Sequence, residues 1–271
     1  MGSAPRISTV HKPAKIIDNS LMQVIYKVRS ITDSLAPDRV AEDNMILQIG
    51  VGGISKFYTD SQKQDSIIQS RISSARMSGS MTTQPGMNIL GDYAGSGNLS
   101  IIFKNWPNKS TTVTDRVVVD VYSYTEPSNP IKWQIVHNTD TILSYLCQKA
   151  ITTFRGRNYE AWFAPDIPIG EGPWKFCGLP GLILKVSDTR NHYVFECIGL
   201  EQIEHPIEYA DLDYIKTNRR TLARVSRRYY DDPVAATRGA GSLEATIRAS
   251  AMANTNDPSI KRAYNPIELD Y

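Results

Sequence analysis

Short stretches of apolar, β-branched and aromatic residues follow one another along most of this 271-residue chain, with turn-forming residues between them. Val117, Val119 and Val121, for example, alternate with their neighbours at the two-residue period of a strand. We expect strands at 21–28, 45–50, 54–58, 99–103, 115–124, 131–137, 142–147, 151–154, 159–163, 182–186 and 192–198. This spacing predicts a mainly β fold, either a strongly curved antiparallel sheet, a sandwich or an open barrel.

Helical periodicity is confined to a few places at the periphery of this pattern. Residues 61–77 form the best helix candidate in the front half, and the Ala-rich stretch 243–252 is a further short candidate. A basic amphipathic helix is predicted where apolar residues recur among cations and a proline follows at position 233. Its cations are Lys216, Arg219, Arg220, Arg224, Arg227 and Arg228.

These patterns divide the chain into three parts. Residues 1–20 are expected to be a flexible lead or a first strand added on assembly. Met1-Gly2-Ser3 resembles a remnant of recombinant expression, so we expect that a signal peptide has been removed. Residues 21–207 form the β-rich domain, and residues 208–271 form a basic, partly helical and partly irregular extension. The chain has no run of 18 apolar residues, so no transmembrane helix is expected.

The usual catalytic and cofactor motifs are missing from the sequence. It contains no phosphate-binding loop, no serine-hydrolase elbow and no zinc-protease helix motif. We therefore expect a protein that is not an enzyme and that has no cofactor, and the net charge of +2 gives no reason to expect nucleic-acid binding. Two alternatives stay open: a reactive thiol at Cys147, and a metal site at Glu204, His205 and Glu208, each of which also has an ordinary structural explanation.

Cys147, Cys177 and Cys197 make an odd number of cysteines. A tight hairpin between the last two predicted strands would place Cys197 opposite Leu182, and Cys177 would lie too far along the chain. A type II turn at 179–182 would bring Cys177 back, because proline and glycine occupy the positions which that turn requires. One interpretation is a Cys177–Cys197 disulfide with Cys147 free; the other is three buried, reduced thiols.

Between residues 155 and 181 the chain concentrates aromatic, basic and turn-forming residues. Tryptophan and arginine are enriched at interaction hot spots, so this region is a candidate binding surface. The candidate residues are Arg155, Arg157, Trp162, Asp166, Trp174, Gly178, Leu179, Pro180 and Gly181. The alternative is structural: the tryptophans plug one end of the sheet, and Arg157 pairs with Asp166 beneath them. The two interpretations are compatible.

The hexapeptide Gly178-Leu179-Pro180-Gly181-Leu182-Ile183 resembles the signature of the GLPGLI family of Gram-negative envelope proteins. Further similarities lie at 49–50, 55–58, 131–135, 147–150, 154–157, 172–176 and 264–268. Ser144 stands where the family is expected to have a glycine. The resemblance implies export to the periplasm or outer membrane and an accessory role near TonB-dependent transporters, but it carries over no catalytic residue.

These observations together favour an exported, non-enzymatic binding or accessory protein. In this hypothesis Trp162, Trp174 and Leu179 contact the partner, while Arg155, Arg157 and Asp166 orient it. The expected partners are an outer-membrane transporter or another envelope protein, with a peptide or lipid as a further possible ligand. The cations between Lys216 and Arg228 would suit an anionic membrane surface. An envelope enzyme or metal-binding protein, and a purely structural scaffold, are the competing classes.

Overall fold

The computed structural model describes residues 14–60, 100–117, 120–128, 130–210, 212–232 and 263–270. The helix predicted at 61–77, the long loop that follows it, and the helix predicted at 243–252 lie outside these residues. Within the described part, the fold is mainly β, as predicted, with thirteen strands and a single helix. No helix in this part is long and apolar enough to cross a membrane.

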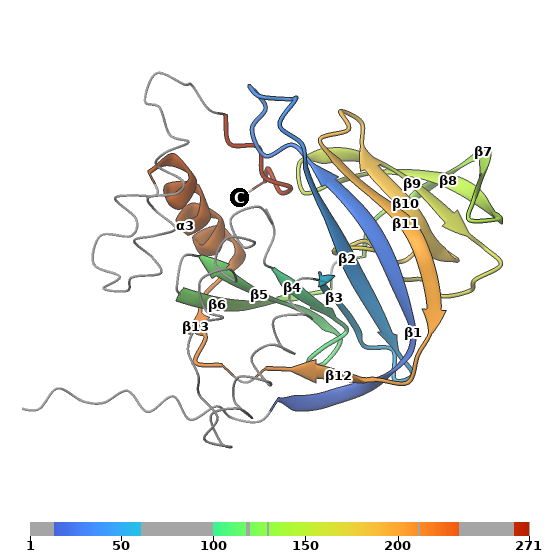
Figure 1. The fold of residues 1–271 in the computed structure, drawn as a ribbon, viewed down its shortest axis with the longest axis horizontal. Helices are drawn as coiled ribbons and strands as arrows, with labels where there is room; N and C mark the ends of the chain where they lie inside the picture. Colours follow the sequence, from blue (N-terminus) through green and yellow to red (C-terminus); the bar gives the residue numbers. More distant parts are fainter. Residues whose placement is uncertain are drawn as a thin grey trace, which may run out of the picture.

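The strands form one large sheet, which bends around the body of the molecule (Figure 1). Its order is β13-β6-β5-β4-β3-β2-β1-β11-β10-β9-β8-β7, and the short β12 pairs with β1. Strand β13 pairs with β6 in parallel, and the other pairs are antiparallel. The two ends of this order, β13 and β7, do not pair with each other, so the sheet is open.

Most strands are short, as expected from the spacing of the turn residues. Their bounds are β1 Lys15–Ser30, β2 Ala41–Gly50, β3 Ser55–Thr59, β4 Ile101–Lys104, β5 Ser110–Val117, β6 Asp120–Pro127, β7 Gln134–Ile142, β8 Tyr145–Phe154, β9 Arg157–Ala164, β10 Leu182–Asp188, β11 Tyr193–Gln202, β12 Pro206–Tyr209 and β13 Ile215–Lys216. The helix, labelled α3, spans Arg219–Asp231.

Strand β1 pairs with three other strands of the sheet. It has 16 residues, pairs with β2 on one side, and pairs with both β11 and β12 on the other. Its register shifts between Ser20 and Met22 toward β2 and between Ile25 and Tyr26 toward β11. Such irregularities bend a strand and increase its twist. Because β1 begins at Lys15, the predicted flexible lead through residue 20 is corrected: residues 15–20 belong to the sheet.

Two predicted strands each divide between two neighbouring, paired strands. The strand predicted at 142–147 is the end of β7, a turn and the start of β8, and the turn residues Leu143 and Ser144 both have positive φ, at 48° and 69°. Leucine and serine are not usual in that conformation, so neither residue type indicates a turn at this position. The strand predicted at 115–124 likewise divides into the end of β5 and the start of β6.

One face of the sheet carries the core. Along β9 the side chains of Arg157, Tyr159, Ala161 and Phe163 are buried at every second position, the pattern of a strand with one covered face. Core residues come from both halves of the sheet and from the 165–181 loop, including Tyr26, Phe57, Ile102, Phe163, Phe176 and Phe195. The loop therefore contributes to the same core as the strands.

The predicted basic helix is present as α3, which begins three residues after Lys216 and ends before Pro233, as expected. Asn218 caps it, because its side-chain oxygen accepts a hydrogen bond from the backbone N–H of Thr221 at 2.9 Å. Leu222 is buried, and Val225 and Tyr229 pack against the core.

Residues 263–270, which we call the C-terminal strap, have no regular secondary structure but run back between α3 and the sheet (Figure 1). The described parts of the expected extension, α3 and the C-terminal strap, thus pack against the β-rich part.

Candidate functional site

The loop between β9 and β10 is a plug that fills the core side of the sheet. Phe176 lies at its centre with no exposed surface. Its ring lies 4.7 Å from that of Tyr159 and 5.1 Å from that of Trp174, and three further aromatic rings lie 6.1–6.3 Å away. Edge-on contacts of this kind stabilise a core beyond the area that they bury. The signature segment is thus built around a phenylalanine that the sequence did not single out.

Two glycines of the signature are needed for different reasons, and the predicted type II turn at 179–182 is wrong. That turn requires a positive φ at Gly181, but Gly181 is not among the residues with positive φ. A Cβ at Gly181 would overlap the carbonyl oxygen of Ala164 and lie 2.7 Å from its carbon, so close backbone approach requires glycine there. Gly178 has φ +91° and open space around it, so its backbone conformation requires glycine.

The apolar residues of the predicted binding surface are mostly inside the protein. Trp174 and Leu179 are each 3% exposed, which corrects their expected role as contact residues and assigns them to the structural plug. Trp162 lies on the opposite face of β9 and is half-buried, with the ammonium of Lys149 5.6 Å from its ring centre. Asp166, Gly178 and Pro180 are exposed. The structure therefore does not bring the three predicted apolar contacts to one surface.

Arg157 is buried and forms an ion pair, but with a different partner from the one predicted. Its guanidinium nitrogen lies 3.1 Å from the carboxylate of Asp188, whereas Asp166 is exposed. The same guanidinium donates to the side-chain oxygen of Asn265 and to the backbone carbonyls of Pro266 and Ile267. Arg157 thus holds the C-terminal strap largely through main-chain oxygens.

Asn265 and the residues around it extend this anchorage. The Asn265 side chain donates to the carbonyl of Ile31, and its own backbone carbonyl accepts from the Tyr193 hydroxyl at 2.7 Å. The Tyr159 hydroxyl donates to the carbonyl of Ile267 at 3.3 Å. The buried polar groups of this part of the strap are therefore paired, as they must be away from water.

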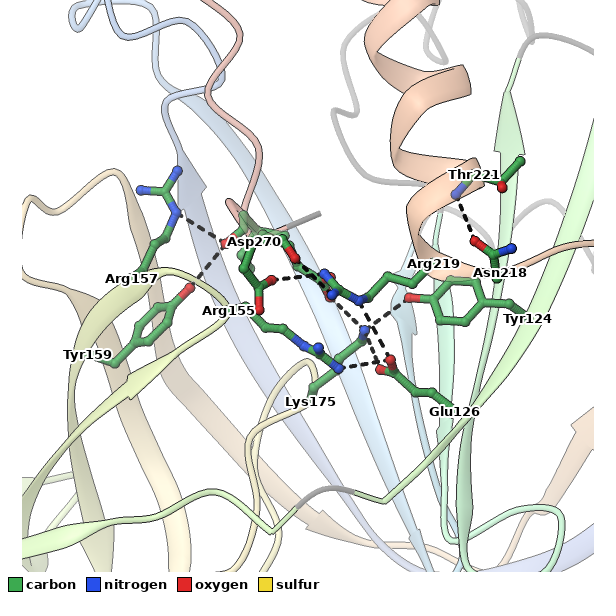
Figure 2. A network of polar contacts seen from close by, with 12 residues as sticks. Tyr124, Glu126, Arg155, Arg157, Tyr159, Lys175, Asn218, Arg219, Thr221 and Asp270 are labelled. Carbon is green, nitrogen blue, oxygen red and sulfur yellow. Dashed lines mark hydrogen bonds and ion pairs between the residues drawn. The ribbon is translucent and has the colours of Figure 1, made fainter.

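A second group of charges meets at the acidic end of the strap (Figure 2). The Lys175 ammonium lies 2.6 Å from the carboxylate of Glu268, 2.7 Å from that of Glu126 and 3.0 Å from the Tyr124 hydroxyl. Lys175 comes from the plug, Tyr124 and Glu126 from β6, and Glu268 from the strap. Three distant segments are thus joined at one ammonium group.

Two arginines complete this group. Arg219, the first residue of α3, lies 3.0 Å from the carboxylate of Glu268 and 2.8 Å from that of Asp270. Arg155, which follows β8, lies 2.8 Å from the carboxylate of Glu126 and accepts the backbone N–H of Leu269 on its own carbonyl. We call Arg155, Arg157, Lys175 and Arg219 the cation cluster.

The charges of this group stabilise one another against the cost of burial. Burial alone lowers the pKa of Lys175, but Tyr124, Glu268 and Glu126 together raise it above its ordinary value. Burial alone raises the pKa of Glu268, but Lys175, Arg155 and Arg219 bring it below its ordinary value. Both groups are therefore charged near neutral pH, and the cluster holds the strap as an anion.

Sequence reasoning selected Arg155 and Arg157 but missed Lys175, Glu126, Arg219 and Glu268 as their associates. Lys175 lies within 172–176 and Glu268 within 264–268, two segments that resemble the GLPGLI family, so the resemblance carried a weak signal for both residues. Their separation of 93 residues gave no indication that they meet.

The predicted Cys177–Cys197 disulfide is absent, and all three cysteines are free. In the hairpin of β10 and β11, Lys185 pairs with Glu196, so the observed register differs from the predicted one by two residues. Cys177 instead turns toward Glu171, with which it forms a β-bridge, and its carbonyl accepts the indole N–H of Trp133 at 2.9 Å. Cys197 lies on β11 opposite Tyr26.

The residues of the competing chemical hypotheses are not arranged for chemistry in the described part of the chain. Cys147 is buried, and burial raises the pKa of its thiol, which disfavours the reactive thiolate. Among the described residues, no three His, Cys, Asp or Glu side chains lie close enough to hold a metal ion. This holds for Glu204, His205 and Glu208 as well. His205 instead accepts the backbone N–H of Ser20 on its carbonyl.

Comparisons with known proteins point to the same segment. Residues 155–185 match a family described as "Protein of unknown function (Porph_ging)". These residues include the end of the β8–β9 turn, β9, the plug and the first part of β10. No curated protein matches the chain.

Two solved structures, described as PNGF-II in the C2 and P21 space groups, match with 12% and 11% identity and a TM-score of 0.49 each. They match over 76% and 78% of this chain and over 32% and 34% of their own. The chain thus spans about a third of the length of these structures.

Proposed function

We propose that this chain is an exported, non-enzymatic binding or accessory protein of the Gram-negative envelope, and that it belongs to the GLPGLI family. The signature hexapeptide and the match of residues 155–185 to a family of unknown function support this proposal. An outer-membrane transporter, or another envelope protein near one, is the partner that the resemblance implies. The activity proposed is recognition of an extended acidic segment by the cation cluster.

The observation that carries the proposal is the way in which the cation cluster holds the C-terminal strap. Arg157 and Arg219 donate to backbone carbonyls of Pro266, Ile267 and Asp270, which any extended peptide would offer. Lys175 and Arg219 bind the carboxylates of Glu268 and Asp270, which selects for acidic residues. Main-chain contacts combined with charge-assisted side-chain contacts are how proteins recognise extended acidic peptides.

The strap leaves part of the cluster unused. The Nε of Arg155 is buried and donates to no acceptor in the described structure. A buried donor without a partner is costly, so the site would gain from a ligand that offers one more acceptor. We therefore interpret the strap as an internal ligand, which a partner's acidic segment displaces.

A competition experiment tests this function on the full chain. Glu268→Gln and Asp270→Asn together weaken the strap without removing its backbone. A fluorescent peptide with the sequence of residues 263–270 is then titrated, and anisotropy is measured. The weakened chain is expected to bind at least tenfold more tightly than the unchanged chain, because its internal competitor has lost two charges.

Two controls make the result specific. A peptide carrying the same Glu-to-Gln and Asp-to-Asn changes is expected to bind weakly, and Lys175→Met in the weakened chain is expected to abolish binding. Circular dichroism establishes that each variant is folded. Absence of peptide binding by the folded, weakened chain would refute the proposed recognition site.

A further inference from the structure

One face of α3 carries arginines for which the described part of the chain offers no side-chain partner. Arg220, Arg224 and Arg228 are exposed and lie four residues apart, so they form a straight row with about 6 Å between neighbours along the helix axis. No partner is found for their side chains among the described residues. Arg227, beside this row, is bound to Asp231 at 2.8 Å. We call Arg220, Arg224 and Arg228 the arginine row.

The helix presents this row from a fixed position. Its other side is held by the buried Leu222 and by Val225 and Tyr229, which pack against the core. At its first turn Arg219 is bound to the strap. The backbone that carries the row is already ordered, so only the arginine side chains lose conformational freedom when a ligand binds.

The placement of Arg220 is unfavourable unless an anion lies nearby. It lies in the first turn of α3, where the helix dipole disfavours cations, and this turn contains no acidic residue. Arg219, in the same turn, is balanced by Glu268 and Asp270, whereas Arg220 has no such partner in the described structure. An external anion at this end would relieve the repulsion.

Exposed apolar residues precede the row. Leu212 and Ile215 are 38% and 46% exposed, and the exposed Lys216 follows them. In Figure 1, β13 lies next to the start of α3, on the same side of the molecule. Apolar side chains next to cations suit the interface of a lipid bilayer, where both the acyl boundary and the phosphates can be contacted.

We propose that the arginine row binds the phosphate groups of an anionic lipid surface, with Leu212 and Ile215 touching the headgroup layer. Guanidinium groups suit this role because they bind phosphate through two parallel hydrogen bonds. The apolar side of α3 is occupied by the protein core, so the binding is peripheral and electrostatic, without insertion of the helix. This surface is independent of the proposed peptide site, since none of its three arginines contacts the strap in the described structure.

Vesicle co-sedimentation tests the proposal on the full chain. Vesicles contain phosphatidylcholine alone or with 30% phosphatidylglycerol, and binding is measured between 50 and 500 mM salt. Binding is expected only to the anionic vesicles and is expected to weaken steeply with salt. Arg220→Gln, Arg224→Gln and Arg228→Gln together are expected to lower the partition coefficient by about 100-fold, roughly fivefold for each charge.

A matched control separates the arginine row from overall charge. Arg39→Gln, Arg116→Gln and Arg190→Gln remove three exposed arginines elsewhere and are expected to change binding by less than about threefold, since these charges lie off the row. Equal losses in the two triple variants would overturn the proposal, as would equal binding to neutral vesicles.

A free-anion arm identifies the source of the phosphate. Inorganic phosphate at the ionic strength of the control salt is expected to compete no better than chloride, because a lipid surface offers many phosphates at once. Release by millimolar phosphate at constant ionic strength would assign the row to a free anion. Stronger retention on polyglutamate than on anionic vesicles would assign it to an acidic protein, and either result would refute the lipid proposal.

Discussion

The ammonium of Lys175 lies 2.6 Å from the carboxylate of Glu268, although 93 residues separate them along the chain. Lys175 belongs to the plug, which includes the first four residues of the signature, and Glu268 belongs to the C-terminal strap. Because both side chains are largely buried, each depends on the other to remain charged. The pair therefore links the signature segment physically to the far end of the described chain.

We expect Lys175→Met to destabilise the protein by about 3–5 kcal/mol, because it leaves the buried carboxylates of Glu126 and Glu268 without their shared cation. Denaturant unfolding measures the loss. Lys185→Met is the matched control: its partner Glu196 is 3.7 Å away and half-exposed, so the expected change is about 0–1 kcal/mol. Similar losses in the two variants would contradict the role assigned to the cluster.

The strap should be most stable at intermediate pH. Burial raises the pKa of Glu268 in the folded state, but its cationic neighbours lower the pKa by more, so the net shift is downward. The contribution of Glu268 to stability is therefore complete above its unfolded pKa of about 4.3, and it is lost as the pH falls through the folded pKa. Lys175 has the opposite pH dependence. Burial lowers its pKa, but neighbouring oxygens raise the pKa by more. Its contribution to stability is therefore complete below its unfolded pKa of about 10.4, and it is lost as the pH rises through the folded pKa.

The variant Glu268→Gln isolates the loss of stability that Glu268 causes at low pH. The unfolding free energies of the unchanged chain and the variant are expected to converge as pH falls below about 4, since a protonated Glu268 and a glutamine are alike in charge. Burial raises the pKa of Asp115 to about 6, so its effect on stability changes with pH in the opposite direction to that of Glu268. Both chains contain Asp115, so this effect cancels in the difference between their unfolding free energies. A difference that stays constant from pH 7 to pH 2 would contradict this account.

Gly181→Ala is expected to destabilise by about 3 kcal/mol, because its Cβ would meet the rigid backbone of Ala164. Gly178→Ala is expected to cost only about 1–2 kcal/mol, since its Cβ meets nothing within 4 Å and only the positive φ is strained. Gly53→Ala, with φ +82° and equally open space, is the control for that strain. Thermal unfolding of the three variants should place Gly181→Ala well below the other two.

Thiol labelling of the native protein should reach Cys177 first. Cys177 is partly exposed, whereas Cys147 and Cys197 are buried, and burial raises the pKa of all three thiols, that of Cys197 to about 11. Mass spectrometry after brief alkylation at pH 7.5 should therefore show slow labelling overall, with Cys147 and Cys197 modified only on unfolding. Rapid native labelling of Cys147 would revive the hypothesis of a reactive thiol.

The β architecture could be predicted because alternation and turn residues act locally. Alternation at Val117 and Val121 indicates β structure, although the two residues belong to the neighbouring strands β5 and β6. Apolar residues that recur among the cations of 216–228 indicate a helix in the same local way. Local rules failed at Leu143 and Ser144, where the chain turns without glycine or asparagine. Glycine would adopt the positive φ of Ser144 without strain, but serine does not mark the turn.

The site could be predicted only in part. The sequence marked the density of arginine, tryptophan, glycine and proline near residue 180, but exposure depends on which segments pack together. Trp174 and Leu179 are buried because the whole loop folds onto the sheet. The partners of Arg157 lie in the strap and at Asp188, and no spacing rule connects them to it. Long-range contacts of this kind are fixed by tertiary structure alone.

The position of β1 between β2 and β11 governs the order in which this fold can assemble. One side of β1 can pair soon after synthesis, since β2 follows closely, but the other must wait until residues 193–202 are available. Pairing across such sequence distances makes folding slow, and a long strand with a bare edge is prone to join another chain. Until β11 arrives, β1 is therefore the segment that a chaperone would have to shield.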